Sequence, residues 1–403
     1  MEGRNESNAR EIALFDFISH ENMHQPFNES YVRTLRAAFP EDRILFHASA
    51  EHIARLAPRL ADLTNVTFGA CPPFRVPFGL SRHNPLGGYW AAYRCLRAMA
   101  PEVSGRQLRL AALLGVDANL YAVVGQRWPR ISTAPLHLIL HGQLGDTMVW
   151  RSRNPIIRAA DFIAAVKRPL PPSVRLIALE LGVSEAIAAI APVNGSVATL
   201  EHPLLVSEWN ASSPVSANDR LRIAFLGNAR RSKGFAVFAK LAQNVSRSDI
   251  EFEAIGIAAP DTDRLDISAL TRKPTRTSMS RQDYLEAVRA VDLVCLPLHS
   301  RAYDFTASGT VGDAVSALKP LIAFRSRTLE AIEARYGPIG WLVDSEAELF
   351  DRVQTLDRNV FLEMRPRWIA NLMKVREARR PETVARNYRA LITGMPTPDS
   401  PLC

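Results

Sequence analysis

Short apolar runs alternate with amphipathic stretches along the first half of the chain. A run at residues 12–17 predicts a buried strand, and a polar loop at 19–29 leads to a predicted helix at 30–39 and a second strand at 43–47. Later segments predict strands at 136–140 and 175–179 and a helix at 184–190, whereas residues 108–114 fit a helix and a strand equally well. Strands that alternate with helices predict a parallel sheet covered by helices.

The same alternation is clearer after residue 221. Seven successive segments predict strand and helix in turn, at residues 222–226, 235–245, 251–257, 281–290, 292–296, 308–318 and 321–324. This series is typical of a doubly wound α/β domain. An apolar, arginine-rich stretch at 353–392 predicts helices that close the structure.

The best linker candidate between the two halves is the stretch at 210–220, which is rich in Asn, Ser, Ala and Pro. A length of 403 residues also favours two domains. We therefore expect one domain at 1–210 and a second at 211–403 that includes the closing helices.

The composition is that of a globular protein, with 47% hydrophobic and 22% charged residues, which excludes a disordered or fibrous chain. No run approaches the roughly 20 apolar residues that span a bilayer, and the polar start lacks the apolar core of a signal peptide. We therefore expect a cytoplasmic location. The four cysteines are too scattered for a zinc or redox motif, and Cys295 is expected to pack inside a strand.

The net charge is +8, from 49 Lys and Arg residues against 41 Asp and Glu residues. This excess favours an anionic partner. Nucleic acid, anionic lipid and phosphorylated substrates all meet that condition, so the choice depends on the motifs.

The first candidate binding loop follows the predicted strand at 222–226. It reads GNARRSKG and places Arg230, Arg231 and Lys233 between Gly227 and Gly234, just before a helix. Ligands of doubly wound sheets bind at the carboxyl ends of the strands, and glycines let a backbone approach a ligand closely. The loop is therefore a candidate diphosphate site, and the alternative is a solvated turn.

The second candidate segment reads YDFTASGTVGDAVSALKP and ends at Pro320. Its apolar residues recur as one buried helical face, and Ser308 is a suitable N-cap. The open helix end at Ser308, Gly309 and Thr310 presents backbone N–H groups that would hold a phosphate, aided by the helix dipole.

Asp313 lies one turn into the same helix. Its carboxylate could accept hydrogen bonds from a pair of ribose hydroxyls, and the alternative is an acid that only stabilises the helix dipole. Together the two segments offer side-chain cations and backbone donors, a combination suited to an anionic diphosphate leaving group.

The order of these motifs resembles that of retaining GT-B glycosyltransferases of the glycogen-synthase-like and sucrose-synthase-like group, known as glycosyl transferases group 1. The matching residues are Gly227, Lys233, Gly234, Val291, Asp292, Leu293, Pro297, Ser308, Gly309, Asp313, Ala314, Lys319 and Pro320. The resemblance covers residues 221–343 and only loosely the N-terminal half. It implies two Rossmann-like, doubly wound domains that face a cleft, with C-terminal helices closing the structure. The domain at 1–210 would bind the acceptor, and the domain at 211–403 would bind the nucleotide sugar.

The resemblance also implies a function. Members of the group move a sugar from a nucleotide-diphosphate donor to a hydroxyl acceptor with retention, and need neither a metal nor a cofactor. Gly227, Lys233 and Gly234 would contact the diphosphate, and Lys233 with Arg230 would stabilise the leaving group. Setting such an enzyme in polysaccharide or glycolipid assembly is a family-level analogy.

The chain departs from the group at two places. The arginine usual after the first glycine is Asn228, so Arg230 or Arg231 would supply the missing charge. The second of the group's two glutamates is matched by Asp313, which implies a ribose contact, whereas the first falls on Phe305 with an aspartate before it. The resemblance therefore does not assign the transferred sugar.

Candidate residues in the N-terminal half are polar side chains after predicted strands. His141 follows the strand at 136–140, where it would contact the sugar or help to move a proton. The loop after the first strand holds His20, His24 and Asn28, which could bind acceptor hydroxyls. The alternatives are a histidine that caps or packs, and a loop that is simply solvated.

Two segments mix aromatic and basic residues: Trp90, Tyr93, Arg94 and Arg97 at helical spacings, and Trp150 with Arg151, Arg153 and Arg158. Such surfaces bind membrane interfaces, which would suit a lipid-linked acceptor and a peripheral position at the inner membrane face. The alternative is that each segment is half core and half solvated surface.

Two other functions are alternatives. A nucleotide-sugar epimerase of the same architecture would need convergent acid and base side chains on both domains, and the N-terminal half shows no acidic pair for this. A basic nucleic-acid-binding protein would need cations interleaved with aromatic platforms on a recognisable fold. We therefore expect a nucleotide-sugar donor and a carbohydrate or lipid-linked acceptor as partners, and no nucleic acid.

Overall fold

The computed structural model describes residues 10–19, 24–77, 83–149, 151–191, 197–209, 220–298 and 300–394, without the side chains of Gln143 and Ser300. The chain divides into two compact units. The first comprises Met1–Pro203 and Pro381–Cys403, and the second comprises Leu204–Arg380.

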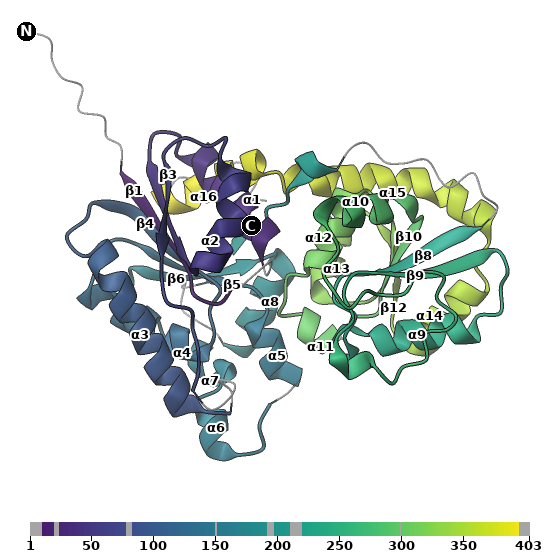
Figure 1. Ribbon diagram of the computed structural model, residues 1–403, viewed down its shortest axis with the longest axis horizontal. Coiled ribbons are helices and arrows are strands. Elements are labelled where there is room, and N and C mark those ends of the chain that lie inside the picture. Colours follow the sequence, from purple (N-terminus) through teal and green to yellow (C-terminus); the bar gives the residue numbers. More distant parts are fainter. Residues whose placement is uncertain are drawn as a thin grey trace, which may run out of the picture. The chain divides into compact units, whose positions relative to one another are not determined.

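The first unit is built on a seven-stranded parallel sheet (Figure 1). The spatial order β3-β2-β1-β4-β5-β6-β7 places the reversal of strand order between β1 and β4. The strands are nearly continuous apolar runs, because helices cover both faces of a parallel sheet. They are β1 Glu11–Asp16, β2 Arg43–Ala48, β3 Val66–Ala70, β4 Leu108–Leu114, β5 Leu136–Leu140, β6 Val174–Leu179 and β7 Val197–Leu200.

The helices of the first unit connect these strands and include several single turns. They are α1 Gln25–Ala38, α2 Ala50–Leu56, η1 Ala57–Leu60, α3 Pro85–Val103, α4 Ala118–Leu120, η2 Tyr121–Gly125, η3 Trp128–Arg130, α5 Gln143–Val149, α6 Pro155–Ala159, α7 Phe162–Val166, α8 Leu181–Ile190 and α16 Pro381–Thr393. No helix in the described ranges of either unit is both long enough and apolar enough to cross a membrane.

The second unit holds a five-stranded parallel sheet in the order β12-β11-β10-β8-β9. Its strand order reverses between β8 and β10, so the crevice that binds ligands in such sheets lies at the carboxyl ends of these two strands. The strands are β8 Leu221–Leu226, β9 Ile250–Ile255, β10 Leu293–Leu296, β11 Leu321–Phe324 and β12 Gly340–Val343.

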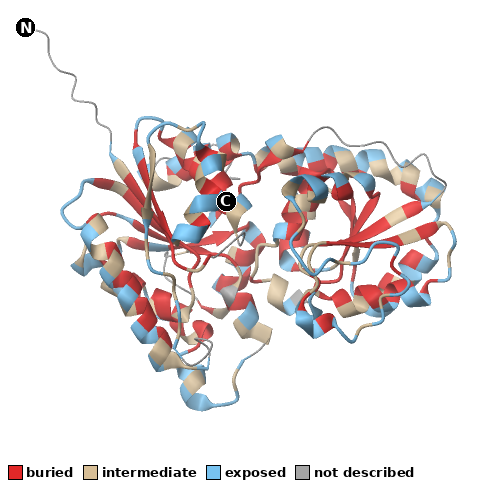
Figure 2. Ribbon diagram, in the orientation of Figure 1, coloured by how far each residue is buried: buried red, intermediate tan, exposed pale blue. Residues whose placement is uncertain are grey.

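Alternate residues of β8 point to two separate cores. Ile223 and Phe225 pack on the side of α9, whereas Ala224 and Leu226 pack on the side of α12. Figure 2 shows the inner strands of both sheets as mostly buried, whereas the edge strands β3 and β7 of the first sheet are largely not. The helices of this unit are η4 Val206–Glu208, η5 Arg231–Lys233, α9 Phe235–Asn244, η6 Pro260–Thr262, α10 Arg281–Ala290, α11 Ser300–Tyr303, α12 Gly309–Ser316, α13 Arg327–Tyr336, α14 Glu346–Gln354 and α15 Arg358–Ala378.

The last helix, α16, returns to the first unit. Tyr388 of α16 hydrogen-bonds Tyr31 of α1, and its hydroxyl lies 2.7 Å from His137 Nδ1 of β5. The chain thus crosses between the units twice, at residues 203–204 and 380–381. The boundary expected at 210–211 is therefore displaced, and the closing helices are divided between the units, because the buried face of α16 fits α1 rather than the second sheet.

Most predicted elements are present within one to three residues of their expected bounds. Residues 108–114, which fitted two structures, form the central strand β4. The first helix begins at Gln25 rather than at residue 30, because Pro26 in its first turn is compatible with a helix start. The linker predicted at 210–220 lies, apart from Arg220, outside the described residues.

Candidate functional site

The loop after β8 has the close backbone packing that its glycines suggested. Gly227 and Gly234 adopt positive φ angles of 84° and 77°. A Cβ atom added at Gly234 would lie 1.8 Å from the carbonyl oxygen of Pro297, directly after β10. Both ends of the loop therefore depend on glycine, and the loop lies at the reversal of strand order.

The start of α12 lies against the same loop. A Cβ atom at Gly227 would come within 2.8 Å of Thr310 Cγ2. The fold thus brings together two segments that are more than 80 residues apart in sequence.

Ser308 is the N-cap of α12, and its Oγ accepts a hydrogen bond from the Val311 N–H at 3.4 Å. The first N–H groups of a helix have no carbonyl partner within it, so those of Gly309 and Thr310 are available to an anion. Gly309 is exposed, and a Cβ added there would meet no atom within 4 Å. The helix start is therefore open on one side.

Lys233 lies half-buried beside Arg230 and Asp313. Burial lowers the pKa of Lys233, Arg230 lowers it further, and the Asp313 carboxylate opposes the shift. Arg230 itself is exposed. An anion placed here would offset the repulsion between the two cations.

Asp313 is bound to a residue that the motifs did not indicate. Its Oδ2 accepts a hydrogen bond of 2.8 Å from the Tyr284 hydroxyl of α10. Burial raises the pKa of Asp313, whereas the Arg281 charge and the bond from Tyr284 lower it. The aspartate therefore has a fixed orientation.

Arg281 continues this network away from Asp313. Its Nε and Nη2 atoms donate to Glu208 Oε2 at 2.9 and 2.6 Å, and its guanidinium lies over the rings of Trp209 and Tyr284. Sequence reasoning missed these partners because Glu208 and Arg281 are 73 residues apart and belong to no shared motif.

Two side chains near the loop have other partners. Arg231 donates from Nε to the Asp261 carbonyl at 2.8 Å, which ties the loop to η6. Asp304, the residue beside Phe305, accepts a hydrogen bond of 2.8 Å from the Arg327 N–H at the start of α13. Phe305 itself is buried.

In the first unit, His141 follows β5 and lies in an aromatic cluster. Its ring stacks on His24 at a centroid distance of 4.5 Å and meets the edge of Phe27 at 4.1 Å. Burial holds the pKa of His141 well below its usual value, and His24 and His202 lower it further. Its buried Nε2 has no hydrogen-bond partner among the described residues. A neutral imidazole with a spare nitrogen suits a substrate contact.

The expectation that Asn28 contacts an acceptor is corrected by its burial. Asn28 is 0% exposed, and its Nδ2 donates to Asp16 Oδ2 at 2.6 Å and lies 2.9 Å from His52 Nε2. Asp16 in turn accepts the Ser19 N–H, so Asn28 helps to hold the loop after β1. His20 lies outside the described residues, and His24 lies 3.2 Å from Ser19 Oγ through its Nδ1.

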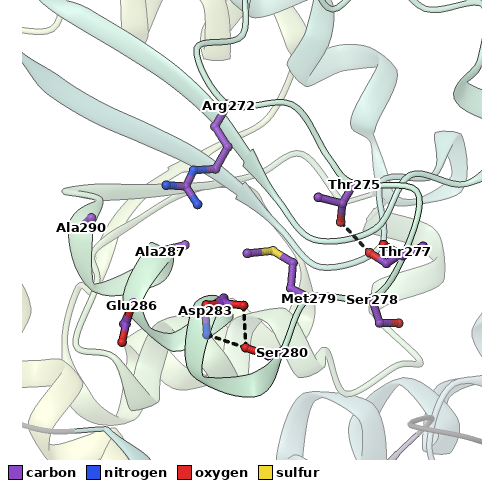
Figure 3. Close-up of a pocket in the computed structure, with 10 residues that line it drawn as sticks. All are labelled: Arg272, Thr275, Thr277, Ser278, Met279, Ser280, Asp283, Glu286, Ala287 and Ala290. Atoms are coloured by element: carbon purple, nitrogen blue, oxygen red, sulfur yellow. Dashed lines mark hydrogen bonds between the residues drawn. The ribbon is translucent and has the colours of Figure 1, made fainter.

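A surface pocket of about 600 Å³ lies beside α10 (Figure 3). Its lining includes Asp283 and Glu286 of α10 and the preceding segment from Arg272 to Ser280. Thr275 in its lining donates its backbone N–H to the Gly256 carbonyl oxygen, and Gly256 packs against the backbone of Gly227, so the pocket begins one strand away from the loop. Two carboxylates also make it unsuited to a diphosphate. Among the described residues, no three His, Cys, Asp or Glu side chains are grouped so as to hold a metal ion.

No protein-family model matches the sequence, and no curated protein matches it. The backbone, in contrast, is similar to several solved structures. HepE of Anabaena, in complex with UDP and glucose, has a TM-score of 0.64 at 14% identity, with 96% of this chain and 100% of that chain covered.

Two further structures agree with this likeness. OtsA without ligand gives a TM-score of 0.64 at 10% identity, with 95% of this chain and 99% of OtsA covered. The lipopolysaccharide outer core galactosyltransferase WaaB gives 0.60 at 10% identity, with the same coverage. Two parallel-sheet α/β units and nearly full-length similarity show that this chain has the two-domain, Rossmann-like GT-B fold.

Proposed function

We propose that this protein is a retaining glycosyltransferase that moves a hexosyl group from a nucleoside-diphosphate sugar to a hydroxyl acceptor, in polysaccharide or glycolipid assembly. One observation carries the proposal: the loop of Gly227 and Lys233 meets the open start of α12 at the reversal of strand order. This arrangement offers cations and backbone donors to one anion, in a fold shared with a structure that holds UDP and glucose.

The leaving diphosphate would be stabilised by cations and by backbone amides. As the bond between the anomeric carbon and the β-phosphate oxygen breaks, negative charge grows on that phosphate. Lys233 and Arg230 would balance this charge, and the amides of Gly309 and Thr310 would donate hydrogen bonds to it. These groups supply the stabilisation that a metal ion gives other transferases.

Retention follows if the acceptor attacks from the side on which the diphosphate departs. The acceptor oxygen then bonds the anomeric carbon, and its proton passes to the departing phosphate oxygen, so no protein base is required. His141 would contact the sugar through its Nε2, which has no hydrogen-bond partner among the described residues. Replacing His141 by alanine should therefore lower turnover without changing nucleotide affinity.

A panel of nucleotide sugars tests the donor class. We expect UDP-sugars to raise the unfolding temperature most, because the similar HepE structure holds UDP. The expected rise is roughly 5 °C at 100 times Kd, since a ligand that binds only the folded state stabilises it. The measurement is a thermal shift with UDP-, GDP- and ADP-sugars, followed by product analysis with and without acceptor. Epimerised donor formed without any acceptor, or no shift with any nucleotide, would count against a transferase.

Asp313 provides a sharper test of the nucleotide site. Asp313→Ala should weaken nucleoside-diphosphate binding by roughly tenfold, because hydrogen bonds from ribose hydroxyls to a charged acceptor are lost. Tyr284→Phe, which frees Asp313 to move, should have a smaller effect in the same direction. Titration calorimetry measures both, with Asp304→Ala as a matched loss of one carboxylate. Equal affinities for Asp313→Ala and the unchanged protein would remove Asp313 from the site.

A further inference from the structure

The outer face of α3 exposes large apolar side chains that the fold does not need. Leu86 is 79% exposed and Trp90 is 65% exposed, and Tyr89 beside them is 39% exposed. Arg94 and Arg97 follow on the same face at helical spacing and are also exposed. An outward helix face is usually polar. This one is instead apolar in its first two turns and cationic in the next two.

The opposite face of α3 accounts for its packing. Ala92, Cys95 and Met99 on that face are buried, so α3 is fixed to the unit without help from Leu86 or Trp90. Tyr89 is held in place by Arg127, whose Nη2 donates to the Tyr89 hydroxyl at 2.6 Å. The exposed residues therefore lie on a rigid support.

A second exposed tip lies on α6. Ile156 is 77% exposed, and Arg153 and Arg158 on either side of it are exposed too. α3 packs on α4, α4 packs on α7, and α6 directly precedes α7 in the chain. Figure 1 shows these four helices on the same side of the first unit.

The charge of both segments has one sign. Residues 71–101 contain four arginines and no Asp or Glu, and residues 147–160 contain three arginines and no Asp or Glu. Asp161, the next acid, is buried and paired with Arg151 at 2.8 Å. Among the described residues of this surface, the apolar tips are therefore flanked by the exposed arginines Arg94, Arg97, Arg153 and Arg158.

We infer that this surface docks on an anionic lipid bilayer. The α3–α6 surface consists of Leu86, Tyr89, Trp90, Arg94 and Arg97 of α3 with Arg153, Ile156 and Arg158 around α6. Trp and Tyr rings prefer the headgroup region, isolated Leu and Ile tips insert below it, and arginines bind lipid phosphates. A second copy of the chain fits less well, because a symmetric contact would place arginines against arginines.

This inference does not depend on the proposed sugar transfer, and its test uses no nucleotide. The full chain is sedimented with extruded vesicles of phosphatidylcholine alone, or with 30% phosphatidylglycerol, at about 0.1 M salt. We expect at least tenfold stronger binding to the anionic vesicles, weakened by added salt.

Two variants remove the two contributions separately. Arg94→Glu with Arg97→Glu, and Trp90→Ala with Ile156→Ser, should each lower binding to anionic vesicles by tenfold or more. The matched control is Arg264→Glu with Arg367→Glu, which makes the same change in net charge at exposed positions of the second unit and should leave binding within twofold. All the replaced side chains are exposed, so circular dichroism and the unfolding temperature should be unchanged.

Three outcomes would overturn the inference. The first is no binding of the unchanged protein to anionic vesicles. The second is equal loss of binding in the control and in the α3 arginine variant, which would show a diffuse effect of net charge. The third is self-association in sedimentation that Trp90→Ala abolishes while vesicle binding persists, which would assign the surface to a second copy.

Discussion

Replacing Lys233 by alanine is expected to lower kcat roughly 100- to 1,000-fold, with a smaller effect on nucleotide affinity. The cation acts most strongly on the charge that develops on the leaving diphosphate, and loss of one preorganised group of this kind has effects of about that size. Product formation from the nucleotide sugar identified by thermal shift, with calorimetric affinity for the nucleotide, measures both quantities.

Lys240 provides the matched control for this change. It lies in the adjacent helix α9, is exposed, and has Glu346 at 3.7 Å as its partner. Lys240→Ala should leave kcat unchanged. If Lys233→Ala retained full turnover in a folded protein, the leaving-group site would lie elsewhere.

The lowered pKa of Lys233 also predicts the alkaline limb of the rate profile. Lysine loses its charge as pH rises through its pKa, and burial places that pKa below the usual 10.5 in the free protein. The midpoint of the alkaline limb of kcat/KM should therefore lie below pH 10.5. In Lys233→Arg this midpoint should move to higher pH, because an arginine stays charged. A limb that is the same in both proteins would assign it to another group.

Replacing Gly234 by alanine is expected to destabilise the protein by about 3–5 kcal/mol and to abolish nucleotide binding. The added Cβ would lie 1.8 Å from the Pro297 carbonyl oxygen, which is backbone, so the loop must shift. The φ angle of 77° adds a further strain of about 1–2 kcal/mol for any residue with a Cβ. Urea unfolding followed by tryptophan fluorescence measures the first effect, and calorimetry measures the second.

A Gly105→Ala variant distinguishes the effect of the Cβ collision from the effect of backbone strain. Its φ of 74° is nearly the same, but a Cβ there would meet nothing within 4 Å. Gly105→Ala should therefore show only the strain, about 1–2 kcal/mol, with nucleotide binding intact. Similar losses in both variants would mean that the Gly227–Gly234 loop tolerates the collision by moving.

Much of the fold was predictable because apolar periodicity is a local property. The strands β1, β5 and β8 are mostly apolar and mostly buried, and burial on both faces is typical of a parallel sheet between helices. The loop at Gly227 and Gly234 was also predictable from local sequence, because glycines beside a helix start permit close backbone packing that other residues do not. The place of α16 was not predictable, because an apolar helix face does not indicate which unit it covers, and its packing on α1, with Tyr388 hydrogen-bonded to Tyr31, joins residues more than 350 positions apart.

For the candidate site, the sequence by itself determined which chemistry is present: a glycine loop with cations, and a helix start with Ser308 and Asp313 near it. Only the tertiary structure decided which of these groups meet. Thr310 lies against Gly227, and the Tyr284 hydroxyl donates a hydrogen bond to Asp313. Asn28 is buried in a hydrogen-bond network with Asp16. The reason is physical: a polar side chain's role depends on its partners and its burial, and both are set by residues distant in sequence.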